Sequence, residues 1–281
     1  MRTLVHISDL HFGRVDAALL APLRERIEAL APHLVVVSGD LTQRATREQF
    51  REAKAFLDTL PQPQVVVPGN HDVPLYNVFQ RVLSPLGKYL SIVTSDLEPS
   101  FIDDEIAVVG VNTARSLTWK RGSIDRHQVD AAMNRIGAVR DRVAKIVVTH
   151  HPFDVPEGHA ESNLVKHASH AMNVFAKCGA DILLAGHLHH TRTSHSARRY
   201  RIPGHSALLV QAGTATSVRG RGEPNSFNAL HLTRDDVRIE RWHWDGASRA
   251  FELGGSERFC RAPDGWHPES HFLETKGLPR M

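Results

Sequence analysis

Short apolar runs rich in β-branched residues alternate with amphipathic stretches along the first two thirds of this 281-residue chain. The runs occupy residues 4–7, 34–37, 65–67, 146–148 and 182–185. Their brevity and composition favour buried strands over helices. Helical patterns lie between them, at residues 19–30, 48–60, 128–139 and 164–178. The alternation predicts an α/β fold with a largely parallel central sheet, because parallel strands need long crossover connections.

The chain changes character after Gly186. Strand-like stretches follow one another with turn residues between them, at residues 200–202, 207–211, 227–233 and 237–244. They predict a second, antiparallel sheet in the same domain. A further strand of the preceding α/β part is expected at 106–111. We place this domain at residues 1–244. Residues 245–281 combine Gly and Pro with large aromatic side chains, and we expect an irregular C-terminal extension packed on the domain or at a subunit contact.

Composition narrows the function classes. Histidine occurs 19 times, as often as glycine, and it is the commonest metal ligand. The net charge is 34 − 31 = +3, too small for a field that would hold nucleic acid, which we therefore do not expect as a partner. The two cysteines lack a Cys-x-x-Cys spacing, which argues against a thiolate zinc site. Without an apolar run of membrane length or a signal-peptide pattern, the chain is expected to be cytoplasmic.

Metal-ligand side chains follow each of the five apolar runs. In chain order they are Asp9, His11, Asp40, Asn70, His150, His187 and His189. Because sites in open α/β sheets are built at the carboxyl ends of the strands, we expect these side chains to share one crevice. A set of Asp, Asn and His without Cys suits Mn²⁺ or iron, with Zn²⁺ or Co²⁺ as alternatives.

Seven ligands exceed what one tetrahedral ion needs, and they suffice for two transition-metal ions, divalent or trivalent, that share a bridging carboxylate. Two ions about 3.5–4 Å apart generate a hydroxide nucleophile and hold the oxygens of an in-line phosphoryl displacement. The sequence therefore predicts a dinuclear phosphoryl-transfer centre.

The series D-x-H, G-D, G-N-H-D, H and G-H-x-H, over roughly residues 3–190, resembles the calcineurin-like metallophosphoesterases. The resemblance implies a sandwich of two mixed β-sheets flanked by helices. It also implies that Asp9, His11 and His189 hold the first metal, that Asn70, His150 and His187 hold the second, and that Asp40 bridges the two.

The resemblance further assigns a catalytic role to the block at 68–72, PGNHD. His71 would contact the phosphate and protonate the leaving group, and a histidine beside a ligand is placed for general acid catalysis. Asp72 would orient the His71 ring, or it would cap a helix that begins at Val73-Pro74. Both interpretations of Asp72 stay open.

Several blocks are most similar to the bacterial class III 3′,5′-cyclic-nucleotide phosphodiesterases, namely GDLTQ, PGNHD, HHPF and GHLHH. We therefore expect a phosphodiesterase that hydrolyses a small phosphodiester by attack of a metal-bridging hydroxide, with His71 as general acid. The alternatives are a glycerophosphodiesterase, a pyrophosphohydrolase of a UDP-2,3-diacylglucosamine-type lipid, and a non-hydrolytic binding module. A homodimer is a further possibility. His151 and His190 adjoin predicted ligands, and either a pocket-lining or an ordinary role fits them.

Overall fold

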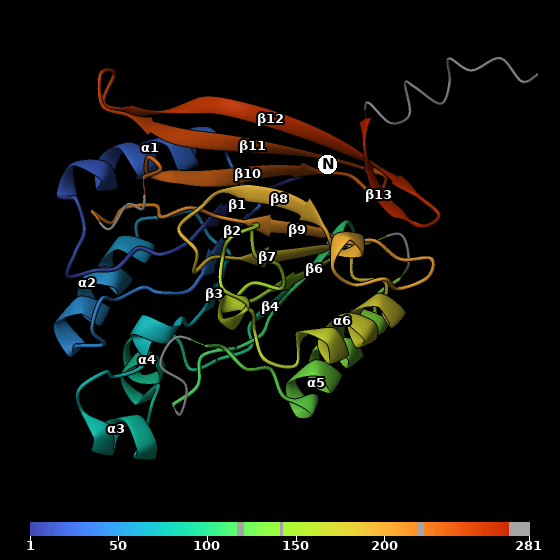
Figure 1. Ribbon diagram of the computed structural model, residues 1–281. Helices are drawn as coiled ribbons and strands as arrows, with labels where there is room; N and C mark the ends of the chain where they lie inside the picture. Colours follow the sequence, from blue (N-terminus) through green and yellow to red (C-terminus); the bar gives the residue numbers. More distant parts are fainter. Residues whose placement is uncertain (117–120, 141–142, 219–221, 270–281) are drawn as a thin grey trace, which may run out of the picture.

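The computed structural model describes residues 1–116, 121–140, 143–218 and 222–269, which form two stacked sheets flanked by helices (Figure 1). The first sheet has the order β13-β12-β11-β10-β1-β2-β3. Its strands are β1 (Arg2–Ile7), β2 (Leu34–Ser38), β3 (Gln64–Val67), β10 (Ser226–Leu232), β11 (Asp236–Asp245), β12 (Ala250–Ala262) and β13 (Gly265–Pro268). Strands β1, β2 and β3 are parallel, and β10 to β13 continue the sheet antiparallel from β1.

The second sheet has the order β4-β5-β6-β7-β9-β8. Its strands are β4 (Ser100–Ile102), β5 (Ile106–Gly110), β6 (Ala144–Val148), β7 (Ile182–Ala185), β8 (Arg192–His195) and β9 (Leu208–Gln211). The four inner strands are parallel, whereas β4 and β8 are antiparallel edges. The helices are α1 (Leu20–Ala29), α2 (Arg47–Leu57), α3 (Val78–Leu83), α4 (Gly87–Ile92), α5 (Arg126–Gly137) and α6 (Ala168–Lys177).

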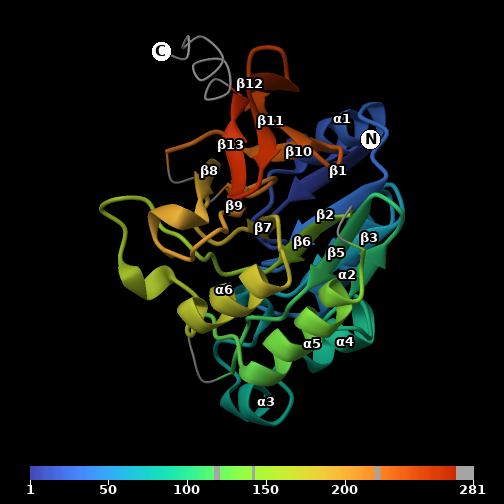
Figure 2. The same cartoon turned by 90° about the vertical axis from the view of Figure 1, so that its right-hand side faces the viewer.

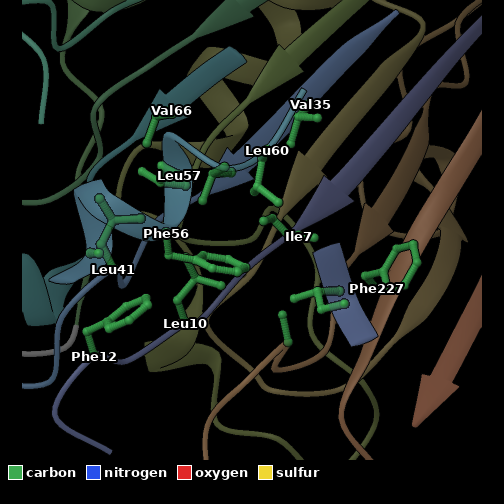
Figure 3. Close-up of a cluster of buried hydrophobic side chains, with 14 of the residues drawn as sticks. Ile7, Leu10, Phe12, Val35, Leu41, Phe56, Leu57, Leu60, Val66 and Phe227 are labelled. Atoms are coloured by element: carbon green, nitrogen blue, oxygen red, sulfur yellow. The ribbon is translucent and has the colours of Figure 1, made fainter. Parts of the chain in front are cut away.

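Strand β2 shows why the apolar runs are continuous instead of alternating. Val36 packs between the two sheets, together with Ile146 of β6. Val35 and Val37 belong to the cluster on the opposite side, together with residues of helices α1 and α2. Figure 3 shows Val35 in this cluster with Leu57 and Leu60. Both faces of the strand are therefore buried, and each face demands an apolar residue.

Helix α2 forms the outer layer over this strand. Thr46 caps it by accepting a hydrogen bond from the Gln49 N–H. Phe50, Ala53 and Leu57 are buried at helical spacing. A third cluster packs α5 and α6 against the second sheet, so the layers run helix, sheet, sheet, helix (Figure 2).

The two-sheet sandwich expected from the resemblance is confirmed, but the strands expected to form one largely parallel central sheet are divided between the two sheets. The five apolar runs divide between the sheets, with β1, β2 and β3 in one and β6 and β7 in the other. Strand β9 joins the second sheet parallel to β7, whereas β10 and β11 join the first. Local periodicity shows that a strand is buried but carries no information about which sheet it joins.

The C-terminal stretch is ordered where irregular structure was expected. Strand β12 pairs with β11 from Ala250 to Cys260, and β13 pairs with β12. Gly254 is the extra residue of a β-bulge, since Arg241 faces Gly255 while Trp242 faces Leu253. Gly254 and Gly255 lie inside a strand, although a glycine pair in a sequence is typical of a loop. The part of the extension at 270–281 lies outside the described residues. Among the described helices, none is long and apolar enough to cross a membrane.

Candidate metal centre

All seven predicted ligands follow strands, and the two sheets bring them to one edge. Asp9 and His11 follow β1, Asp40 follows β2, and Asn70 follows β3 of the first sheet. His150 follows β6, and His187 and His189 follow β7 of the second sheet. The contacts below join side chains from both sheets, so the centre lies where the two sets of carboxyl ends meet.

One group of ligand atoms surrounds Asp9. Its Oδ1 lies 3.5 Å from His11 Nε2 and 3.3 Å from His189 Nε2. The two imidazole nitrogens are 3.4 Å apart. Ligands bound at about 2.0–2.2 Å from a shared ion lie roughly 3–3.6 Å from one another, as these three atoms do. This trio is the predicted first-metal set.

The Asp40 carboxylate lies between this group and a second one. Its Oδ2 is 3.8 Å from His11 Nε2, and its Oδ1 is 3.4 Å from His150 Nε2. His150 Nε2 is also 3.1 Å from Asn70 Oδ1. The other ring nitrogen, Nδ1, donates to the Ser38 carbonyl at 2.7 Å, which turns Nε2 toward the centre. Asp40 thus lies between the two groups, with one oxygen facing His11 and the other facing His150.

His187 completes the second group and brings an additional histidine with it. Its ring centroid lies 5.2 Å from that of His150 and 4.7 Å from that of His151. His150, His151 and His187 place ligand nitrogens within 4.8 Å of one another. The His151 Nδ1 lies 2.9 Å from the Thr113 hydroxyl. His151 therefore belongs to the wall of the centre, whereas His190 contacts Glu223 at 2.8 Å.

A buried oxygen shows that these residues fit a cation. Asp9 Oδ2 accepts from the Ser8 hydroxyl and the His187 N–H. Asp9 Oδ1 is fully buried and has no hydrogen-bond partner among the described residues, although two imidazole nitrogens face it. Burying an unsatisfied anionic oxygen is costly, and a cation held by the same three side chains would satisfy it.

Backbone strain is concentrated at the same positions. Asp9, His11, Asp40, His187 and His189 all have φ between 52° and 75°. They are five of the nine non-glycine residues with positive φ that the described ranges contain. Such conformations cost about 1–3 kcal/mol each and persist where function constrains the backbone.

Two glycines of the sequence blocks are required by close packing at the centre. A Cβ on Gly69 would lie 2.1 Å from Asp40 Oδ1. A Cβ on Gly39, whose φ is +94°, would lie 2.6 Å from His150 Nδ1. Any larger residue would displace a ligand, which explains why glycine stands before Asp40 and before Asn70 in this chain.

The electrostatics without a cation keep Asp40 charged and His187 neutral, as metal binding requires, but they favour a protonated His150. Burial alone would raise the pKa of Asp40. The nearby His150 and His71 outweigh burial, so the pKa of Asp40 lies well below its ordinary value. Burial lowers the pKa of His187 to about 3, which keeps its ring neutral. For His150 the effect of burial is outweighed by Asp40, which raises the pKa to about 9. A cation at Asp40 would therefore displace a proton from His150.

His71 is held against the centre from two sides. Its backbone N–H donates to Asp40 Oδ1 at 2.8 Å. Its ring Nδ1 lies 2.9 Å from the Gln43 carbonyl oxygen, which only accepts, so Nδ1 carries a proton. The ring stands edge-on to His11 with centroids 5.0 Å apart. A proton given to a substrate would come from Nε2.

Asp72 holds the loops of the centre. Its carboxylate accepts from the N–H groups of Leu41, Thr42 and Gly69 and from the Thr42 hydroxyl, at 2.9–3.1 Å. These bonds tie the loop after β2 to the loop after β3, while Gln43 contacts the His71 ring. The helix expected to start at Val73-Pro74 begins only at Val78, and Asn77 caps it. Burial, and then the charge of Asp40, raise the pKa of Asp72 to about 6.

Thr42, Gln43, Ser38 and Thr214 support the centre, and the sequence motifs did not single them out. Thr214 donates its hydroxyl to the Asp9 carbonyl and lies 3.2 Å from His189 Nδ1. Thr42 and Gln43 stand inside the GDLTQ block, which was the available signal. Nothing near Thr214 in the sequence marks it.

The family model described as calcineurin-like phosphoesterase matches residues 2–191 of this chain. The chain belongs to this family. The matched range contains all seven predicted ligands, and the chain is a metallophosphoesterase by family.

Named relatives within the family are distant. The cyclic adenosine monophosphate phosphodiesterase CpdA of Escherichia coli K12 is 22% identical over 201 residues, or 66% of this chain and 69% of CpdA. The glycerophosphodiester phosphodiesterase GpdQ of Enterobacter lignolyticus is 36% identical over 85 residues, or 25% of this chain and 29% of GpdQ. This chain covers between 29% and 69% of the length of the curated relatives that it matches. For two of these relatives it covers less than two thirds.

A solved dimetal phosphatase from Danio rerio has the same fold. The TM-score is 0.61 at 14% sequence identity, and the match covers 85% of this chain and 95% of that one. At this identity the similarity establishes the architecture and leaves the reaction to the site.

Proposed function

We propose that this phosphoesterase is a dinuclear metal-dependent phosphodiesterase that acts on a small diester, with a 3′,5′-cyclic nucleotide as the best candidate. The observation that carries the proposal is the position of Asp40, whose two oxygens lie 3.8 Å from His11 and 3.4 Å from His150. One carboxylate whose two oxygens each face a different histidine is suited to holding two ions close together.

The residues that would hold the ions fall into two sets. Asp9, His11 and His189 would hold one ion, Asn70, His150 and His187 the other, and Asp40 both. Bound ions of this kind neutralise phosphate charge and lower the pKa of water. Mn²⁺ or iron fits the oxygen and imidazole ligands, and no thiolate takes part.

His71 is proposed to serve the leaving group. Gln43 fixes its ring and Asp40 fixes its backbone, so Nε2 is held beside the ligands. From there it would contact a phosphate oxygen and protonate the departing alkoxide. Such proton transfer contributes about 10²–10⁴-fold to a rate. Asp72 supports this arrangement by holding the loop that carries Thr42 and Gln43.

The relatives support a diester substrate. CpdA is named for cyclic adenosine monophosphate and GpdQ for glycerophosphodiesters, and both substrates are diesters with an alkoxide leaving group. A glycerophosphodiester is therefore the second candidate, favoured by the higher local identity to GpdQ. A UDP-2,3-diacylglucosamine-type pyrophosphate is the third.

A comparison of bis(p-nitrophenyl) phosphate with p-nitrophenyl phosphate tests the reaction class. We expect the diester to be hydrolysed with the higher kcat/KM, and a clear preference for the monoester would contradict the proposal. A panel of cyclic AMP, a glycerophosphodiester, UDP-2,3-diacylglucosamine and single-stranded DNA then separates the candidates. Asn70→Ala should abolish turnover, and the exposed Asn173→Ala is the matched control.

A further inference from the structure

An apolar face stands exposed at one end of the molecule. Six of the ten exposed large hydrophobic residues in the described ranges lie between residues 76 and 90. Five of them form what we call the α3 face: Tyr76, Val78, Phe79, Val82 and Leu83. Phe79 is 83% exposed and Leu83 is 80% exposed. Helix α3 projects beyond α4 in both views (Figures 1 and 2). Patches of this kind in folded proteins mark interaction surfaces.

The fold anchors α3 so that this face points outward. Residues 78, 79, 82 and 83 are linked by the three- and four-residue spacings that put side chains on one side of a helix. Arg81 points the other way and is buried, with its guanidinium donating to the carbonyls of Pro74 and Ser116. The Asn77 side chain caps the first turn. The contacts of Arg81 and Asn77 therefore fix the helix in an orientation that leaves its apolar side chains exposed to solvent.

Cationic side chains border this face on one side. Residues 73–95 contain no Asp or Glu, and of their two cations Lys88 is partly exposed while Arg81 is buried and points away from the face. Outside this segment, the exposed Arg44 stacks on the Tyr76 ring at 5.7 Å. Lys88 donates to the Ala45 carbonyl. Burial, and then the charge of Arg47, lower the pKa of Lys88. Arginine and lysine thus border the apolar side chains along the loop that leads into α2.

We propose that the α3 face docks on an anionic lipid bilayer. Apolar side chains enter the boundary between headgroups and acyl chains, while bordering cations attract the anionic headgroups. A second copy of the chain fits less well, because a two-fold contact sets the same patch against itself and would bring its cations together. Charge complementarity therefore favours the bilayer.

Docking would bring the metal centre to the bilayer. Tyr76 follows Asp72 by four residues, and Arg44, which stacks on Tyr76, directly follows the Gln43 that contacts His71. A phosphodiester at the membrane surface would then meet the centre without crossing the body of the protein. This surface is independent of the proposed reaction, since none of its residues is a proposed ligand.

Vesicle co-sedimentation of the full chain tests the proposal. Vesicles of phosphatidylcholine alone are compared with vesicles that also contain phosphatidylglycerol. Wild type should bind the anionic vesicles, and added salt should weaken the binding. Phe79→Ser with Leu83→Ser should lower the affinity at least about tenfold, since two buried apolar side chains are lost. Arg44→Gln and Arg47→Gln should each lower it roughly fivefold.

The matched control is Ile102→Ser with Leu253→Ser, which removes two half-exposed apolar residues from β4 and β12. It should bind as wild type does, and all variants should keep the circular-dichroism spectrum and the turnover of bis(p-nitrophenyl) phosphate. The proposal is overturned if wild type ignores anionic vesicles, or if the control loses as much affinity. It is also overturned if wild type is a dimer by light scattering that Phe79→Ser with Leu83→Ser dissociates.

Discussion

Oδ1 of Asp40 and Nε2 of His150 lie 3.4 Å apart although their residues follow strands of different sheets, β2 and β6. The pair joins the two halves of the sandwich at the centre. Two carboxylates and five imidazole or amide groups converge there because the strand ends do, and because Gly39 and Gly69 leave room for the contact.

Asp40→Asn tests the bridging role. The amide keeps the size of the side chain but replaces one anionic oxygen by a donor, so one ion loses a ligand. We expect the bound metal to fall from two ions per chain to one or fewer. Turnover should fall by more than the about 10–100-fold typical of a residue that only supports a ligand. Metal analysis and kcat measure both effects. Asp58→Asn on the surface should change neither.

His71→Ala separates proton donation from simple phosphate contact. The hydrogen bond to Asp40 uses the His71 backbone and survives the substitution. Metal content should therefore stay unchanged. Turnover should fall by about 10²–10⁴-fold for an alkyl leaving group and much less for p-nitrophenolate, which needs no proton. Equal losses for the two leaving groups would assign His71 to charge stabilisation alone. His127→Ala, which is exposed, serves as control.

Asp72→Asn tests whether Asp72 acts through the loops. An amide nitrogen would face at least one of the N–H groups that the carboxylate now accepts from. Leaving buried donors unpaired costs about 1–3 kcal/mol each, so we expect about 3 kcal/mol less unfolding free energy in urea. Asp245→Asn is the control, because Asp245 accepts similar backbone bonds that are exposed to solvent. Unchanged stability in Asp72→Asn would show that the four bonds are not needed.

His6 predicts a loss of stability in acid. Burial outweighs the charge of Asp9 and lowers the pKa of His6 from 6.5 to about 3. The unfolded chain therefore binds a proton that the folded chain does not, so stability falls as the pH drops from about 6.5 toward 3. The cost is roughly 1 kcal/mol for each pH unit in that window. In His6→Gln the thermal midpoint should depend less on pH between 4 and 6.5 than in wild type or His127→Gln. Identical pH profiles would contradict this.

The buried strands and the positions of the candidate ligands could be predicted from the sequence, because each depends on one local requirement. Val35, Val36 and Val37 are apolar because both faces of β2 are covered, and this made the strand visible. The ligands could be grouped from their positions in the sequence, because residues that follow parallel strands meet at one edge. Their left-handed backbone at Asp9 and Asp40 was beyond prediction, since it depends on tertiary packing.

Other features are set by contacts that local pattern does not encode. The sheet to which β9 or β10 belongs depends on neighbours far along the chain. Strand β12 was hidden by Gly254, which serves a bulge opposite Trp242. The exposed face of α3 was invisible, because Phe79 and Leu83 look like core residues until the fold leaves them outside.

The most direct test of the account is the metal content of the purified protein after supply of Mn²⁺ or Fe²⁺, measured by inductively coupled plasma mass spectrometry alongside Asn70→Ala and Asn173→Ala. The account predicts about two transition-metal ions per chain in wild type and in Asn173→Ala, with a loss in Asn70→Ala. Wild-type protein without bound metal, or with one ion that Asn70→Ala leaves in place, would contradict it.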